Sequence, residues 1–160
     1  MLEATLNFAR DETIAEPRRP TDLTSLLQSI TDDMSDAGLP VTVASVESLV
    51  YECRPIALKR ALTNLIDNAI KYGKKAHAAI IVTPKVVEIR IDDEGPGIPE
   101  SELSCVFEPF YRVEESRSRE TGGIGLGLAI AQSIAQSHGG ELVLSNRPTG
   151  GLRASMTLPR

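Results

Sequence analysis

The chain has 160 residues, of which 41% are hydrophobic and 24% are charged, and its formal net charge is −5. This length fits one domain with a single hydrophobic core. The acidic balance argues against a nucleic-acid-binding protein, because such proteins usually carry a basic surface. No apolar run reaches the ~18 residues of a membrane-spanning helix, and the N-terminus has no signal-peptide pattern, so we expect a domain that is not inserted in a membrane.

The first 19 residues are predicted to precede the main domain. Leu2, Leu6 and Ala9 recur at helical spacing, but residues 1–10 are too short to form an independent helix. We interpret them as the end of a longer helix. The acidic stretch and the Pro-Arg-Arg-Pro sequence within residues 11–20 predict a linker, and we place the main domain at residues 20–160.

The next elements alternate between helices and short strands. A helix is predicted to begin at Thr21 or Asp22, since both are good N-caps, and to end at Gly38. Short strands are predicted at residues 41–45 and 48–52. A second helix is predicted from Pro55, which suits a first helical turn, to Gly73.

The second half of the chain is predicted to form two hairpins separated by a loop and a helix. Strands at residues 77–84 and 85–93 form the first hairpin, and residues 111–123 are a polar loop that could act as a lid. A helix from Leu126 to Ser137 precedes strands at 141–146 and 152–159. This order predicts an α+β sandwich with two layers, in which the helices lie on one face of a mostly antiparallel, mixed sheet.

Three sequence blocks combine residue types that suit a nucleotide site. They are ALTNLIDNAIKYG at 61–73, DEGPGIP at 93–99 and GGIGLGLAI at 122–130, with FEPFYR at 107–112 between the last two. The four blocks resemble the N, G1, F and G2 boxes of the catalytic and ATP-binding domain of sensor histidine kinases, nearest to the EnvZ-like class. The resemblance covers residues 20–159. It implies the Bergerat (GHKL) ATP-binding fold, with ATP and Mg²⁺ as cofactors.

The first block places two amides on one helix face. Asn64 and Asn68 are one turn apart, and an amide oxygen suits a Mg²⁺ ion that keeps several waters and bridges phosphates. The resemblance implies that Asn68 binds the metal and that Asn64 lines the same cleft. It also implies that Lys71 contacts a phosphate and that Tyr72 lies against the nucleotide.

The second block contains the residue expected to select the base. A carboxylate accepts a hydrogen bond from the exocyclic amine of adenine and cannot accept one from the carbonyl of guanine. The D-x-G-x-G-I spacing assigns this role to Asp93, although Asp92 precedes it directly. Gly95 and Gly97 would let the backbone approach the base, and Ile98 would pack below it.

The remaining contacts are expected around the phosphates. By resemblance, Arg112 approaches the terminal phosphate, so that Asn68, Lys71 and Arg112 form the catalytic set. The glycine-rich loop that opens a helix would cradle phosphates. Its residues are Gly123, Ile124, Gly125, Leu126, Gly127 and Leu128. The family usually has a hydroxyl residue where this chain has Ile124. The last block, at 150–155, is assigned no ligand contact.

The identity of residue 64 favours phosphoryl transfer over hydrolysis. The wider superfamily includes gyrase, Hsp90 and MutL, whose catalytic glutamate corresponds to Asn64, and an amide cannot act as a general base. Neither His77 nor His138 lies in a phosphoacceptor sequence. The resemblance therefore implies that the γ-phosphoryl group passes to a histidine on a helical hairpin of the same kinase dimer, and then to a response regulator. It implies a cytoplasmic domain of a homodimer anchored in the bacterial inner membrane.

Two other functions stay open at this point. One is a nucleotide-binding interaction module that does not transfer phosphate, which the departure at Ile124 favours. The other is a serine kinase of the anti-sigma type. Zinc is not expected, since Cys53 and Cys105 have neither CxxC spacing nor a histidine cluster.

Overall fold

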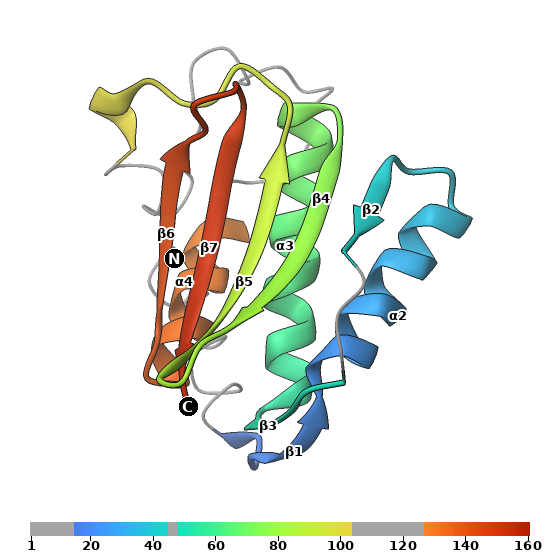
Figure 1. Cartoon of the computed structure of the whole chain (residues 1–160), viewed down its shortest axis with the longest axis vertical. Coiled ribbons are helices and arrows are strands. Elements are labelled where there is room, and N and C mark those ends of the chain that lie inside the picture. The colour runs from blue at the N-terminus through green and yellow to red at the C-terminus, as the bar shows by residue number, and fades with distance from the viewer. Residues whose placement is uncertain (1–14, 45–47, 104–126) are drawn as a thin grey trace.

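The computed structural model describes residues 15–44, 48–103 and 127–160 (Figure 1). Arg112, Gly123, Ile124, Gly125 and Leu126, together with the whole expected lid at residues 111–123, lie outside these residues. The elements are β1 (Arg19–Asp22), α2 (Leu23–Asp36), β2 (Val41–Val43), β3 (Val50–Cys53), α3 (Pro55–Gly73), β4 (Ala76–Val82), β5 (Val86–Asp93), the short 3₁₀ helix η1 (Glu100–Glu102), α4 (Gly127–Ser137), β6 (Glu141–Asn146) and β7 (Leu152–Pro159).

The strands of the main sheet lie in the order β2-β4-β5-β7-β6. β2 runs parallel to β4, and the other neighbours are antiparallel. Figure 1 shows α3 and α4 together behind β4, β5, β7 and β6, with α2 beside β2. The predicted α+β sandwich with helices on one face of a mixed sheet is therefore confirmed. No helix in the described part of the chain is both long and apolar enough to span a bilayer.

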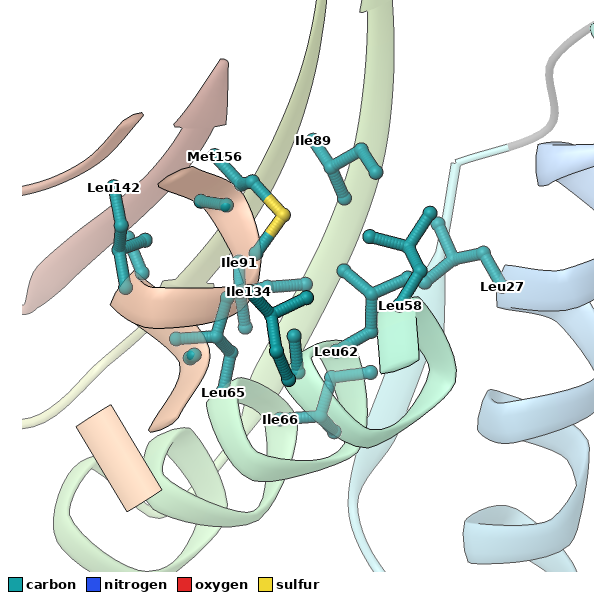
Figure 2. Close-up of a cluster of buried hydrophobic side chains, with 14 of the residues drawn as sticks. Leu27, Leu58, Leu62, Leu65, Ile66, Ile89, Ile91, Ile134, Leu142 and Met156 are labelled. Carbon is teal, nitrogen blue, oxygen red and sulfur yellow. The ribbon is translucent and has the colours of Figure 1, made fainter. Parts of the chain in front are cut away.

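The core lies between the sheet and the helices. Residues along β4 and β5 alternate between buried and less buried, as in a strand with one covered face. The buried side chains labelled in Figure 2 come from three helices and three strands: Leu27, Leu58, Leu62, Leu65, Ile66, Ile89, Ile91, Ile134, Leu142 and Met156. Each fully buried side chain of this size contributes about 1.5–3 kcal/mol relative to exposure. The core therefore holds α3 firmly on the sheet.

The N-terminus of α2 is capped as its sequence predicts. The backbone N–H of Ser25 donates to Oδ1 of Asp22 at 3.1 Å, and the hydroxyl of Ser48 donates to Oδ2 at 2.6 Å. The hydrogen bond from Ser48 is the main reason that the pKa of Asp22 lies below its ordinary value. Because a charged carboxylate also favours a helix N-terminus, the cap sets the start of α2 at Leu23.

One part of the predicted linker forms a strand. Arg19 and Pro20 belong to β1, which pairs antiparallel with β3 in a separate two-stranded sheet. Pro20 has no N–H to donate, but it is tolerated in a strand whose partner lies on one side only. Tertiary pairing with β3 therefore makes part of the Pro-Arg-Arg-Pro segment regular.

Glu16, which precedes β1, caps the N-terminus of α3. Arg54 is the N-cap of α3, but its side chain makes no capping hydrogen bond. Instead, Oε2 of Glu16 accepts from the backbone N–H of Ile56 at 2.8 Å, and Oε1 accepts from that of Ala57 at 2.9 Å. The Glu16 carboxylate thus satisfies two of the free N–H groups at the start of the helix.

Arg54 and His138 connect this cap to the end of α4. The guanidinium of Arg54 donates to the carbonyl oxygens of Glu16 and Ser137, at 3.0 and 2.7 Å. Nε2 of His138 accepts from the backbone N–H of Arg54 at 3.0 Å, so the proton lies on Nδ1, 2.8 Å from the carbonyl of Ile134. Burial lowers the pKa of His138 and keeps the ring neutral. This histidine is part of the packing between two helices.

We predict that Glu16→Ala lowers the free energy of unfolding by about 1 kcal/mol, as loss of a helix cap does, because two N–H groups lose their acceptor. Denaturant unfolding of the chain measures this. Glu52→Ala is the matched control, since Glu52 is exposed and makes no hydrogen bond or ion pair within the described residues. Equal unfolding free energies for the two variants would contradict the capping role.

Candidate nucleotide-binding site

Asp93 is a buried carboxyl group at the end of β5. The residue is only 6% exposed. The backbone N–H groups of Gly95 and Leu152 both donate to Oδ1, at 3.0 and 2.9 Å. Within the described residues, Oδ2 has no hydrogen-bond partner. One oxygen therefore anchors the side chain, while the other can accept a hydrogen bond from a ligand.

Burial raises the pKa of the Asp93 carboxyl above its ordinary value, although the two backbone N–H groups act in the opposite direction. A buried carboxylate with a free oxygen is costly unless a donor reaches it. An exocyclic amine of a base is such a donor. The electrostatics of Asp93 thus favour a ligand that brings an N–H group to Oδ2.

Glycines give Asp93 the room that it occupies. A Cβ on Gly73 would overlap Cγ of Asp93, and a Cβ on Gly151 would overlap the Asp93 backbone oxygen. A Cβ on Gly95 would lie 2.6 Å from Cα of Gly73. Gly73 is therefore needed for close packing, and the positive φ at the end of α3 falls on Lys74, at 70°. The end of α3, the end of β5 and the β6–β7 turn meet at Asp93.

The amide pair lies on one face of α3. Successive residues are rotated by about 100°, so Asn64, Asn68 and Lys71 fall within a narrow arc of the helix. Both asparagines are half-buried. The side-chain amide of Asn64 donates to the carbonyl of Gly127 at 3.4 Å, a long hydrogen bond. A Cβ on Gly127 would lie 3.7 Å from Nδ2 of Asn68.

This contact brings together two blocks that are far apart in the sequence. Gly127 is the first residue of α4, and Leu128 follows it as a partly buried residue packed against the core. Backbone N–H groups at a helix start attract anions. The amides of α3 and the N-terminus of α4 therefore lie side by side, in an arrangement that suits a phosphate group.

Asn68 has the properties expected of a metal ligand with few protein partners. Its side chain is half-buried and makes no hydrogen bond within the described residues, so its amide oxygen is available. In the same residues, no group of three or more His, Cys, Asp and Glu side chains could hold a metal ion by itself. A single amide ligand fits a Mg²⁺ ion that takes its other ligands from water and phosphates.

Lys71 and Tyr72 lie at the end of the same helix. Nζ of Lys71 forms an ion pair with Asp67 one turn earlier, at 3.0 Å, and both side chains are more than one-third exposed. Such an exposed pair is worth less than about 1 kcal/mol, so it can yield to a phosphate. Tyr72 is half-buried, and its carbonyl would be 2.7 Å from a Cβ on Gly95.

The loop after Asp93 is held from the other side by Asn146. Its amide exchanges two hydrogen bonds with the backbone of Ile98, and Gly97 has a φ of 76° beside it. Sequence reasoning missed Asn146, Arg147, Gly151 and Leu152, and it assigned the 150–155 block no ligand contact. The consecutive glycines at 150 and 151 were a signal, because glycine often marks a close approach of two backbones.

The chain matches the family model described as "Histidine kinase-, DNA gyrase B-, and HSP90-like ATPase" over residues 53–160. It is 42% identical over 161 residues to the sensor histidine kinase GtrS of Pseudomonas aeruginosa, an alignment that includes all of this chain and 33% of GtrS. It is 42% identical over 106 residues to the sensor histidine kinase CpxA of Escherichia coli, which is 66% of this chain and 23% of CpxA. The chain thus spans a third or less of these relatives.

Solved structures agree with the sequence comparisons. The crystal structure of the ATP-binding domain of PrrB from Mycobacterium tuberculosis is 34% identical, with a TM-score of 0.73, and the match covers 89% of this chain and 96% of that one. The mycobacterial sensor histidine kinase MprB is 28% identical, with a TM-score of 0.75 and coverage of 89% and 97%. Because both the family model and a solved domain match most of its length, the chain belongs to the histidine kinase-, DNA gyrase B- and HSP90-like ATPase family, and within it to the sensor histidine kinases.

Proposed function

We propose that this chain binds ATP with Mg²⁺ and donates the γ-phosphoryl group to a histidine of a separate phosphoacceptor hairpin. The observation that carries the proposal is the buried Asp93, whose Oδ1 is used by two backbone N–H groups while Oδ2 has no partner among the described residues. A carboxylate oxygen in that state selects an amine, and adenine presents one where guanine presents a carbonyl.

The phosphates would lie between α3 and α4. Asn68 would hold Mg²⁺, which neutralises phosphate charge when it is bound. Asn64 lines the same cleft and holds the carbonyl of Gly127. Lys71 would exchange Asp67 for a phosphate oxygen, and the sequence suggests Arg112 as a further phosphate contact.

The proposed reaction is transfer, since residue 64, where the related ATPases carry a general base, is an asparagine in this chain. Phosphoryl transfer depends mostly on positioning and charge neutralisation, which Asn68, Lys71 and Arg112 would supply. Hydrolysis would need a group that removes a proton from water, and the amide of Asn64 cannot do so. The acceptor nucleophile would therefore come from the phosphoacceptor hairpin.

The partners follow from this reaction and from the relatives, which are named sensor histidine kinases. We propose that the phosphoacceptor hairpin belongs to the same kinase dimer, that a response regulator receives the phosphoryl group, and that the whole protein is anchored in the inner membrane with this domain on the cytoplasmic side. A module that binds nucleotide without transferring phosphate is the second candidate, because Ile124 replaces a hydroxyl residue of the family.

We predict that the chain binds ADP and not GDP, and that Asp93→Asn lowers ADP affinity at least tenfold, about 1.4 kcal/mol. An asparagine keeps an oxygen for the N–H groups of Gly95 and Leu152 but turns a donor toward the adenine amine. Calorimetric titration measures the affinities, and the melting temperature shows that the variant is folded. Equal ADP affinity in both proteins, or equal affinity of the unmodified chain for GDP, would contradict the role of Asp93.

We predict that Asn68→Ala abolishes the dependence of ATP affinity on Mg²⁺, since the amide oxygen is the proposed protein ligand. Titrations with ATP in Mg²⁺ and in EDTA should differ several-fold for the unmodified chain and agree for the variant. Asn64→Ala is the comparison, because it alters the same helix face and should keep most of the Mg²⁺ effect. Persistence of the full effect in Asn68→Ala would mean that another residue binds the metal.

We predict that the chain alone hydrolyses ATP very slowly and that it phosphorylates a separately supplied hairpin from its own kinase. With γ-labelled ATP, the product on the hairpin should be acid-labile and base-stable, as phosphohistidine is. A base-labile product on serine would support the serine-kinase alternative. Nucleotide binding without any transfer would support the interaction module, and rapid phosphate release that the hairpin does not change would indicate an ATPase.

A further inference from the structure

We propose that Asn146 and Arg147, at the start of the β6–β7 turn, are positioning residues that hold the loop from Asp93 to Ile98 in the shape that recognises the base. This inference rests on the function proposed above, because it concerns the same nucleotide site. Neither residue belongs to the four sequence blocks, and both come from a part of the chain about 50 residues away from the loop.

Asn146 binds the end of the loop at Ile98 through both the nitrogen and the oxygen of its side-chain amide. Nδ2 donates to the carbonyl of Ile98 at 2.7 Å, and Oδ1 accepts from the N–H of Ile98 at 2.9 Å. The side chain thus pairs with one residue as a neighbouring strand would, and two hydrogen bonds fix the orientation of Ile98 as well as its position. Aspartate, leucine or serine could not make this pair, because none has both a donor and an acceptor on a planar group of this length.

Gly97 is shaped to receive this amide. Its φ of 76° lies in the left-handed region, and a Cβ there would overlap Oδ1 of Asn146 and lie 3.2 Å from its Cγ. Glycine is therefore required at position 97 by backbone conformation and by the approach of Asn146. This gives Gly97 a role within the protein, in addition to any contact with a base.

Arg147 binds the start of the loop at Asp93. Nη1 donates to the backbone carbonyl of Asp93 at 2.6 Å, and Nε lies 3.8 Å from Oδ2 of Asp92, buried and without a hydrogen bond. Arg153 makes two hydrogen bonds to Asp92, at 2.9 and 3.1 Å. The two adjacent carboxyl groups thus have different partners. Asp92 pairs with two arginines, whereas the side chain of Asp93 accepts hydrogen bonds from backbone N–H groups.

The turn itself is closed by backbone hydrogen bonds. The N–H of Arg147 donates to the carbonyl of Gly151 at 2.8 Å, and the N–H of Gly150 donates back to the carbonyl of Arg147 at 3.1 Å. This closure brings the N–H of Leu152 to Oδ1 of Asp93. One hydrogen-bonded turn therefore contacts both ends of the loop, at the carboxylate of Asp93 and at the backbone of Ile98.

A change in the β6–β7 turn should therefore affect binding of the base and binding of the phosphates differently. The loop carries Asp93 and Ile98, which are the proposed base contacts, whereas Asn64, Asn68 and Lys71 of α3 are the proposed phosphate contacts. Loosening the turn should weaken binding of the base and leave the reacting phosphate in place. In kinetic terms, KM for ATP should rise while kcat at saturating ATP changes little.

Asn146→Ala tests the inference, with Thr149→Ala as the matched control in the same turn. Thr149 is exposed and makes no hydrogen bond within the described residues. We expect Asn146→Ala to weaken ADP binding about tenfold, to raise KM for ATP on the phosphoacceptor hairpin by a similar factor, and to leave kcat within about twofold. Thr149→Ala should match the unmodified chain in all three quantities. Arg147→Ala should behave like Asn146→Ala, and Arg147→Lys should recover part of the loss.

Hydrogen exchange separates positioning from general unfolding. In Asn146→Ala without nucleotide, the amide of Ile98 should exchange faster, whereas amides of the core strands should not. Unchanged ADP affinity in Asn146→Ala, or a fall in kcat with an unchanged KM, would overturn the positioning role. Failure of the unmodified chain to bind ADP at all is a different result, because it would overturn the proposed function itself.

Discussion

The organisation of this domain depends on one buried carboxyl group. A carboxylate away from water is costly unless it is hydrogen-bonded, and Asp93 is the only buried carboxyl group among the described residues. Its backbone donors come from Gly95 and from Leu152, so the end of β5 and the β6–β7 turn must meet there. Gly73 and Gly151 lack side chains at the points of closest approach. Both backbone donors bind Oδ1 of Asp93, so Oδ2 is left for a ligand. The hydrogen bonds that stabilise the loop therefore also orient the group that we propose binds the base.

The two halves of the site rest on different kinds of structure. Asn64, Asn68 and Lys71 lie on α3, whose opposite side is buried in the core (Figure 2), and a packed helix holds its side chains with little freedom. Asp93 and Ile98 lie on an irregular loop, which has no ladder of hydrogen bonds of its own and takes them from the β6–β7 turn. The Glu16 carboxylate and the Arg54–His138 contact fix the start of α3 and the end of α4. Glu16, which precedes β1 in the sequence, thus contacts the helix that carries the amides.

The sequence was sufficient for the elements with a strong local signal. The long helix after Pro55, the hairpin of β4 and β5, and the cap at Asp22 all follow from periodicity and from residue types with one strong local preference. The strand at Arg19 and Pro20 was not predicted, because its stability comes from pairing with β3, and a proline-containing stretch reads locally as a linker. Gly73 was predicted as the end of α3. The structure shows that glycine is needed there because Asp93 packs against it, and that the residue with positive φ is Lys74.

By itself, the sequence determined the fold class and the order of the elements after β1, because helices and strands leave repeating patterns of apolar residues along the chain. The short spacings within its motifs also singled out Asp93, Asn64 and Asn68 as candidates. Only the tertiary structure decided which groups surround Asp93 and what holds its loop. The hydrogen bonds from Asn146 to Ile98, from Arg147 to Asp93 and from Leu152 to Asp93 join residues 48, 54 and 59 positions apart. Contacts of side chains with distant backbone groups follow no period along the chain, because their partners are brought together by the packing of the sheet, so no local pattern in the sequence records them.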